Sequence, residues 1–332
     1  MKVIKLLAVL FITAALVTSC NSNSSDEKAK EAERLKRDYF GLNYSHSESS
    51  GYKGKVKSVK KTEYHAYSKF GDIVIDTIIS QQHIKYNEDG YVTYKEFLDK
   101  DHYTGVYSYE YTYTYEKSDG KHITNCFTDD TLVERTIEFL NDNHFPTQTD
   151  VYNSNGELSE GTKYKYEENN RLLERVTYNR DGRATQRLNG IKYDRNVFPC
   201  EYTEYNYSYN DNKKEESITT TQLAHDEYGR ILSHIQLTDG KKDFQMRFTY
   251  KGKGDKLSSY TYITFIDGEE NFKFESQCYE NCNENIVQTG DEKPEKTRNE
   301  FERDSKENIT KINSFVNDEP NRVTITEFEY YE

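Results

Sequence analysis

Alternating tyrosines are the residues of this sequence whose types and spacing most directly indicate binding chemistry. Tyr107, Tyr109, Tyr111, Tyr113 and Tyr115 occupy every second position of one run. In an extended strand, all five rings would therefore lie on one face. An exposed row of rings is a platform on which a sugar can stack, so we expect ligand stacking here. The same row could instead cover a sheet face or pack in a core, and the sequence leaves both interpretations open.

Cysteines are the next residues that could carry chemistry. Four follow Cys20 in the chain, namely Cys126, Cys200, Cys278 and Cys282. An even number suits disulfide formation in an oxidising compartment, and Cys278 and Cys282 are the candidate pair, provided that a turn lies between them. Structural zinc needs four ligands, and no second pair stands at comparable spacing. We therefore expect a disulfide or buried thiols, and no metal.

Catalytic motifs are absent from the sequence. It has no GxSxG elbow, no HExxH helix and no glycine loop for phosphate. Acids do occur before glycine at Asp89 and Asp181, where a glycosidase pair could lie, but an acid beside glycine is also what a tight turn prefers. We expect no catalytic residue and no cofactor. The alternative is an envelope enzyme, such as a carbohydrate-active hydrolase, whose acids converge only in the fold.

The elements that must position these residues are strands joined by turns. Between Thr162 and Arg187 the chain reads TKYKY, EENNR, LLERVTY and NRDGR, which alternates strand and turn. Residues 171–178 alternate apolar and polar side chains, as a half-buried strand does. The stretch from Asn179 to Gly182 supplies residues that tolerate the positive φ values of hairpin turns. Successive strands should therefore be antiparallel neighbours.

This pattern repeats along the chain. Six copies carry an aromatic residue or histidine four positions before glycine or asparagine: 67–71, 86–90, 152–156, 166–170, 178–182 and 225–229. The 12 residues from Tyr166 to Tyr178 suffice for one strand and one turn. Consecutive copies thus predict an all-β meander of hairpins.

Composition supports a folded β protein and excludes some partners. Only 34% of the 332 residues are hydrophobic, but 30 are tyrosines, which favour strands and can fill thin hydrophobic layers. The formal net charge is −13, and Lys and Arg are interleaved with Asp and Glu. A phosphate-binding surface needs a dense basic face, so we expect no nucleic-acid partner.

The N-terminus predicts export. Met1 to Lys5 is basic and Leu6 to Val17 is apolar, a run too short for a bilayer, which needs about 20 residues. The quartet that ends at Cys20 resembles a bacterial lipobox, which implies that residues 1–19 are a lipoprotein signal peptide and that Cys20 is acylated. Several acyl chains would anchor the protein stably in a bilayer.

The residues after Cys20 form the expected tether. Residues 20–44 begin with a serine-rich stretch and an acidic pair, Asp26 and Glu27, and continue with good helix formers. This start resembles the signal that sends Bacteroidetes lipoproteins to the cell surface. We therefore expect a lipidated, flexible or helical tether on the outer membrane, with the cell surface favoured over the periplasmic face, and a single β-repeat domain over 45–332.

A family resemblance accompanies the repeats. YNRDGR at 178–183 and DEYGR at 226–230 look like the YD repeat of RHS-type proteins. FERDSKENITK at 301–311 and RVTITEFEYY at 322–331 resemble the terminal unit of RHS-repeat lipoproteins of Bacteroidetes, with Glu307 where that unit usually has glycine. The resemblance implies stacked hairpins in a curled or spiralling sheet. It does not imply encapsulation of a toxin, because this chain is several times shorter than the large RHS shells.

The resulting functional prediction is a membrane-anchored envelope lipoprotein with a non-catalytic β-repeat scaffold. Its partners would be the bilayer, through acylated Cys20, and a glycan or an envelope protein, through the exposed aromatic face. The hydrolase described above is the alternative.

Overall fold

A computed structural model describes residues 50–332, except for 102–104, 119, 144, 168–170, 195–197, 211–212, 227–229, 252–256, 267 and 291–292. The expected signal peptide at 1–19, the tether at 20–44 and the acylated Cys20 lie outside the described residues. Those three expectations therefore stay predictions.

The described residues form twenty strands in one sheet. The strands are β1 (Val56–Lys69), β2 (Asp72–Tyr86), β3 (Val92–Asp101), β4 (Gly105–Ser118), β5 (Lys121–Thr128), β6 (Thr131–Leu140), β7 (Pro146–Asn153), β8 (Leu158–Tyr166), β9 (Leu172–Asn179), β10 (Ala184–Asp194), β11 (Phe198–Asn210), β12 (Lys213–His225), β13 (Ile231–Thr238), β14 (Lys241–Tyr250), β15 (Leu257–Ile266), β16 (Glu269–Cys278), β17 (Cys282–Thr289), β18 (Glu295–Arg303), β19 (Ile309–Val316) and β20 (Glu319–Tyr330).

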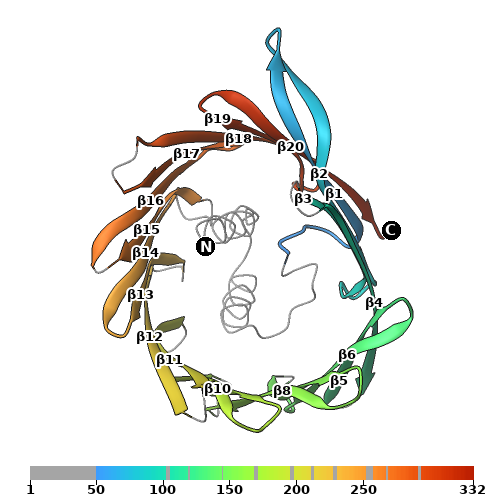
Figure 1. Cartoon of the computed structure of the whole chain (residues 1–332), viewed down its shortest axis with the longest axis vertical. Helices are drawn as coiled ribbons and strands as arrows, with labels where there is room; N and C mark the ends of the chain where they lie inside the picture. The colour runs from blue at the N-terminus through green and yellow to red at the C-terminus, as the bar shows by residue number, and fades with distance from the viewer. Residues whose placement is uncertain are drawn as a thin grey trace.

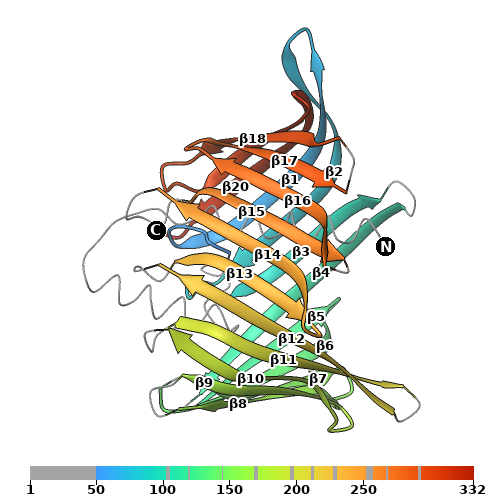
Figure 2. The ribbon, with the colours of Figure 1, turned by 90° about the vertical axis from the view of Figure 1, so that its left-hand side faces the viewer.

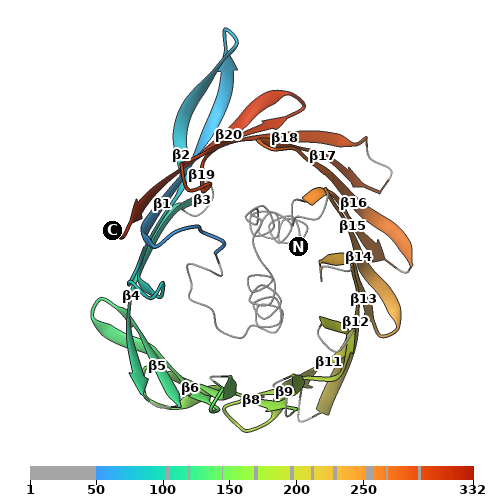
Figure 3. The same ribbon diagram turned by 180° about the vertical axis from the view of Figure 1, so that it is seen from behind.

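The sheet closes on itself. Each strand pairs antiparallel with the next, and β1 pairs with both β2 and β20, with Val59 opposite Phe328. Figures 1 and 3 show the resulting ring from its two ends, and Figure 2 shows the strands inclined across the wall. Closure pairs the first strand with the last along most of their length, which removes the two edges that an open sheet would expose.

The expectation of a curled or spiralling sheet is therefore wrong. The antiparallel meander itself is present, but β20 returns to β1, so the sheet is a closed barrel, and the described residues include no helix. The spacing of the repeats predicts only that strands adjacent in the sequence pair with each other. The return of the last strand to the first is a contact between residues more than 250 positions apart, which no local pattern encodes.

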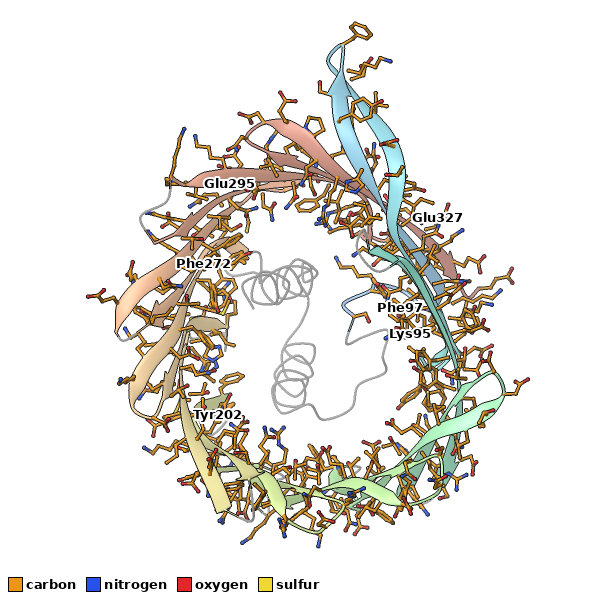
Figure 4. The ribbon with its side chains drawn as sticks, in the orientation of Figure 1. Lys95, Phe97, Tyr202, Phe272, Glu295 and Glu327 are labelled. Carbon is orange, nitrogen blue, oxygen red and sulfur yellow. The ribbon has the colours of Figure 1, made fainter. Side chains whose placement is uncertain are left out.

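Strand register assigns the side chains to two faces. Lys95, Phe97, Tyr202 and Phe272 point toward the inside of the ring, and Glu327 points outward (Figure 4). Side chains alternate along a strand, and directly opposite residues on neighbouring strands share a face. The labelled residues therefore show which face, inner or outer, each residue paired with them occupies. The inner and outer faces of the barrel can therefore be compared strand by strand.

The largest apolar cluster lies on the inner face. Met246, Phe248, Tyr260 and Phe274 are buried together on β14, β15 and β16, and the register joins them to the inward-pointing Phe272. Side chains on the concave side of a curved sheet converge, so rings on neighbouring strands can cover one another. This cluster is thus a thin apolar layer on the inner wall, of the kind that the tyrosine-rich composition predicts.

The repeated motifs form capped loops. In the 179–183 loop, Asn179 Oδ1 accepts hydrogen bonds from the backbone N–H groups of Asp181 (3.1 Å) and Arg183 (3.0 Å). The same arrangement recurs at the residues that begin other loops, namely Asn141, Asn153 and Asp304. In four of the six repeat copies, the polar residue that follows the aromatic or histidine accepts from a loop N–H group, namely Asn87, Asn153, Asn179 and Asp226.

Other strand pairs are joined by tighter turns. Four of them place two consecutive residues at positive φ: Phe70-Gly71, Asp129-Asp130, Asp239-Gly240 and Asn317-Asp318. This is the geometry of type I′ hairpin turns, whose twist matches that of the flanking strands. All four connect an odd-numbered strand to the next even-numbered one and so lie at one end of the barrel, where the capped loops that begin at Asn153 and Asn179 also lie.

Among the described residues, no helix is long and apolar enough to cross a membrane.

Candidate functional site

The inner wall at β3 and β4 carries an aromatic surface with polar neighbours. We name the residues Gln82, Lys95, Phe97, Tyr109 and Tyr111 the inner aromatic patch. Gln82 lies opposite Phe97, Phe97 opposite Tyr109, and Lys95 opposite Tyr111, so all five share the inner face. The register of three adjacent strands thus gathers two of the tyrosines identified from the sequence with a phenylalanine, an amide and an ammonium group.

Exposure distinguishes the members of this patch. Tyr109 exposes 51% of its surface although it faces the inside of the barrel, while Phe97 and Tyr111 are half-buried. The Lys95 Nζ lies 4.7 Å from the centroid of the Phe97 ring. A barrel of twenty strands is well above the size of about eight at which wall side chains fill the interior. The patch can therefore present an aromatic face together with hydrogen-bond donors and acceptors.

The rest of the tyrosine row packs into the wall. The Tyr115 hydroxyl donates a 2.5 Å hydrogen bond to the Val92 carbonyl oxygen, and its ring centroid lies 5.2 Å from that of Tyr91. Burial raises the pKa of both Tyr113 and Tyr115 above the ordinary value. The row expected to stack a ligand is thus divided, with Tyr109 and Tyr111 accessible and Tyr113 and Tyr115 engaged in structure. The side chain of Tyr107 lies outside the described residues.

A second aromatic wall was missed by sequence reasoning. The cluster of Met246, Phe248, Tyr260 and Phe274 lies across the ring from β4 (Figure 1). Its strands do alternate apolar and polar residues, for example in the Phe244 to Tyr250 stretch, but they lack an unbroken row of one residue type. The period-two signal alone could have found them.

The four cysteines that the structure describes, Cys126, Cys200, Cys278 and Cys282, are free thiols. A turn does separate Cys278 from Cys282, and the Tyr279 N–H donates to the Cys282 carbonyl oxygen at 2.8 Å. However, Cys278 is opposite Asn283, so it shares a face with Asn283 and not with the adjacent Cys282. The two thiols therefore point to opposite faces of the sheet. This structure does not contain the Cys278–Cys282 disulfide, which stays a prediction.

A shallow pocket lies where β4, β5 and β6 meet at one end of the barrel. Its lining includes Tyr91, Glu116, His122 and Glu138. The His122 Nδ1 lies 4.0 Å from the Glu138 Oε2 on the inner face, whereas Glu116 belongs to the outer face by register. The two carboxylates in the pocket wall therefore start from opposite sides of the sheet. In the part of the chain that the structure describes, no group of three or more potential metal ligands was found.

The outer face of the wall is charged along β18. On β18, Lys296, Arg298, Glu300 and Glu302 all point outward by register. Interstrand ion pairs lie on this face, including Lys311 Nζ to Glu302 Oε1 at 2.8 Å. An outward row of two cations followed by two anions is suited to contact with water, because charged side chains are costly against lipid.

Comparisons with known proteins found similarity only among solved structures. No protein-family model and no curated protein matches the chain. A porin-like protein from Bacteroides uniformis aligns with 84% of this chain and 98% of its own, at 11% identity and a TM-score of 0.38. A porin-like protein from Bacteroides vulgatus aligns with 83% of this chain and 98% of its own, at 9% identity and a TM-score of 0.25.

Toxin chains also align. The TcdB2-TccC3-TEV structure matches 77% of this chain and 21% of its own, at 9% identity and a TM-score of 0.19. At such identities and TM-scores, neither group supports an argument about activity or location. The reasoning below rests on the geometry of this chain.

Proposed function

We propose that this protein is a non-catalytic binding barrel of the bacterial envelope that takes a glycan against the inner aromatic patch. The observation that supports this most directly is the 51% exposure of Tyr109 on the inner face, beside Phe97 and Tyr111. The apolar C–H face of a sugar ring packs against an aromatic ring, while its hydroxyl groups need hydrogen-bond partners. Gln82 and Lys95 can supply those partners from neighbouring positions on the same face.

The proposed attachment to the membrane is through lipid and not through the wall. Lys296, Arg298, Glu300 and Glu302 cover the outside of β18, and a Lys or Arg on the lipid face costs about 2–4 kcal/mol at the bilayer midplane. A wall of this kind is better suited to water. We propose that acylated Cys20 tethers the barrel to the outer membrane, on the cell surface.

Glycan binding is tested on the chain from residue 20 onward. A glycan array would identify ligands, and titration calorimetry would then compare Tyr109→Ala with the unchanged chain. One aromatic contact contributes about 0.5–1.5 kcal/mol beyond buried area, so we expect affinity to fall about tenfold. The matched control is Tyr279→Ala, because Tyr279 is equally exposed at 54% but lies on the turn between β16 and β17.

Two results would contradict this proposal. A blank array would remove the glycan as ligand, and unchanged affinity in Tyr109→Ala would remove the patch as the site. The location is tested separately by protease treatment of whole cells that carry either the natural chain or Cys20→Ala. Loss of surface cleavage in the variant is the expected result, and protection of both chains would place the protein on the periplasmic face.

The glycans identified on the array also distinguish the hydrolase alternative from binding alone. An enzyme would release shorter sugars from any glycan it binds, and loss of that release in Glu138→Gln would favour the pocket beside His122. We propose that the bound glycan is recovered intact.

A further inference from the structure

The β1–β2 hairpin extends beyond the rest of the barrel (Figures 1 and 2). Pairing between β1 and β20 ends at His65 opposite Arg322, and pairing between β2 and β3 ends at Ser80 opposite Asp99. Residues 66–69 and 72–79 are therefore paired only with each other. A two-stranded hairpin of this kind is marginally stable in water unless something else covers it.

The residue at the apex of this hairpin has both an unfavourable backbone conformation and an unfavourable exposure to water. Phe70 has φ +55°, a left-handed conformation that is unfavourable for a bulky residue, and it is 97% exposed. The corresponding position in the other three two-residue turns at this end is Asp129, Asp239 or Asn317, which suit that conformation and prefer water. An aromatic residue that departs from the local rule on both counts indicates a contact that the isolated chain does not make.

Both faces of the hairpin expose apolar side chains. Ile73 and Ile75 are 37% and 42% exposed on one face, and Tyr67 is 45% exposed on the other. Contiguous exposed apolar residues at one place on a protein mark an interaction surface. Together with Phe70, these residues form what we call the hairpin tip.

A lipid bilayer is a poor occupant for the hairpin tip. The outer edges of residues 66–69 and 72–79 have no strand neighbour among the described residues, so they present unpaired backbone groups. Hydrocarbon offers no hydrogen bonds to such groups, and open strand edges are therefore excluded from it. The occupant must supply backbone hydrogen bonds as well as apolar contacts, which an added strand does.

Charge limits which strand can be added. The β2 edge carries Asp72 and Asp76 and no Lys or Arg between residues 72 and 79. If the β2 edges of two copies paired, four carboxylates would come together without a cation, which disfavours a second copy of this chain. The complementary partner is an extended segment that alternates apolar residues with Lys or Arg.

We infer that the hairpin tip is a docking site for a basic, apolar strand of another protein, which adds to the free edge of β2 over residues 72–79. Side chains of the partner strand would lie beside Ile73 and Ile75, its cations would face Asp72 and Asp76, and Phe70 would cover its end. This inference does not depend on ligand binding by the inner aromatic patch.

The test uses two eight-residue peptides, one of alternating lysine and valine and the other of alternating glutamate and valine. Hydrogen exchange is measured on the chain from residue 20 onward with each peptide in excess. We expect the lysine peptide to slow exchange at residues 72–79 and the glutamate peptide to leave it unchanged. In the double variant Asp72→Lys/Asp76→Lys, binding of the lysine peptide should weaken about tenfold, since each exposed pair contributes up to about 1 kcal/mol.

The control variant is Glu319→Lys, which reverses an exposed acid at the start of β20 at the same end of the barrel. It should bind the lysine peptide as the unchanged chain does. The inference is overturned if neither peptide protects residues 72–79, or if the double variant binds the lysine peptide equally well. Binding to phosphatidylcholine–phosphatidylglycerol vesicles that Phe70→Gly abolishes, or a dimer that it dissociates, would also overturn it in favour of lipid or a second copy.

Discussion

Arg230 stacks on Tyr250, and Tyr250 in turn donates a hydrogen bond to the carbonyl oxygen of Ile231, the residue that follows Arg230. The guanidinium carbon lies 4.5 Å from the ring centroid, and the hydroxyl oxygen lies 3.0 Å from the carbonyl oxygen. Asp226 completes the unit, because its carboxylate accepts from Arg230 Nε at 2.6 Å. The end of the loop before β13 is thus held to the end of β14.

The same unit recurs at two other repeat loops. In each, an arginine ends the loop, one strand follows, and the tyrosine lies on the strand after that. It is formed by Arg171, Tyr193 and Leu172, and again by Arg183, Tyr209 and Ala184. The repeat pattern therefore describes a fastening between neighbouring hairpins.

The first prediction concerns this fastening. Arg230→Ala should lower the free energy of unfolding by about 3 kcal/mol, because it leaves the largely buried carboxylate of Asp226 without its cation. Tyr250→Phe should cost about 1 kcal/mol for the lost hydrogen bond. Urea unfolding of the two single variants and the double variant would measure their coupling. Additive losses would contradict a shared unit, and Lys85→Ala, which removes an exposed cation from Tyr94, serves as the control.

The second prediction concerns the capped loops. Asn179→Ala removes the acceptor for the N–H groups of Asp181 and Arg183, so the free energy of unfolding should fall by about 1 kcal/mol. Asn179→Asp retains an acceptor oxygen in the same place and should be close to neutral. Thermal unfolding of both variants checks this, and equal losses would show that the capping oxygen contributes nothing.

The third prediction is a pH dependence. Burial lowers the pKa of His234 to about 4, from an ordinary value of 6.5. This side chain packs edge-on against Phe244, with ring centroids 4.9 Å apart, and its Nε2 is buried without a hydrogen-bond partner among the described residues. Between about pH 6.5 and pH 4, the unfolded chain binds a proton that the folded chain resists.

Stability should therefore fall with pH over that range, by at most about 1.4 kcal/mol per pH unit from this group. Above pH 7 the group makes no contribution to the pH dependence, because it is neutral in both states. Urea unfolding at pH 7 and pH 5 should show a smaller difference in His234→Gln than in the unchanged chain. His65→Gln, at an exposed position on β1, should leave that difference unaltered.

The fourth prediction concerns the cysteines. In a Cys20→Ala chain that is unfolded without reductant, an alkylating reagent should label four thiols, at Cys126, Cys200, Cys278 and Cys282. Mass spectrometry gives the count directly. Two labels, together with an unlabelled peptide that contains Cys278 and Cys282, would show instead that the bond expected from the sequence forms.

Much of the wall could be predicted from the sequence because its determinants are local. The alternation around Tyr109, the polar residue after each repeat aromatic and the turn glycines each act within a few residues, and they specify antiparallel strands. The same local signals identified Tyr109 and Tyr111 as candidate ligand contacts. They could not separate these two from Tyr115, whose hydroxyl bonds to Val92 on the neighbouring strand.

A β meander of hairpins, a tyrosine-rich thin core and a charged surface follow from the sequence, since each depends on residue type and short spacing. Three features arise only in the folded barrel: the pairing of β20 with β1, the inward orientation of the inner aromatic patch, and the place of Phe70 at the end of a hairpin without further strand neighbours. These features depend on register and closure between distant residues. Their energies come from contacts that exist only when the whole ring has formed.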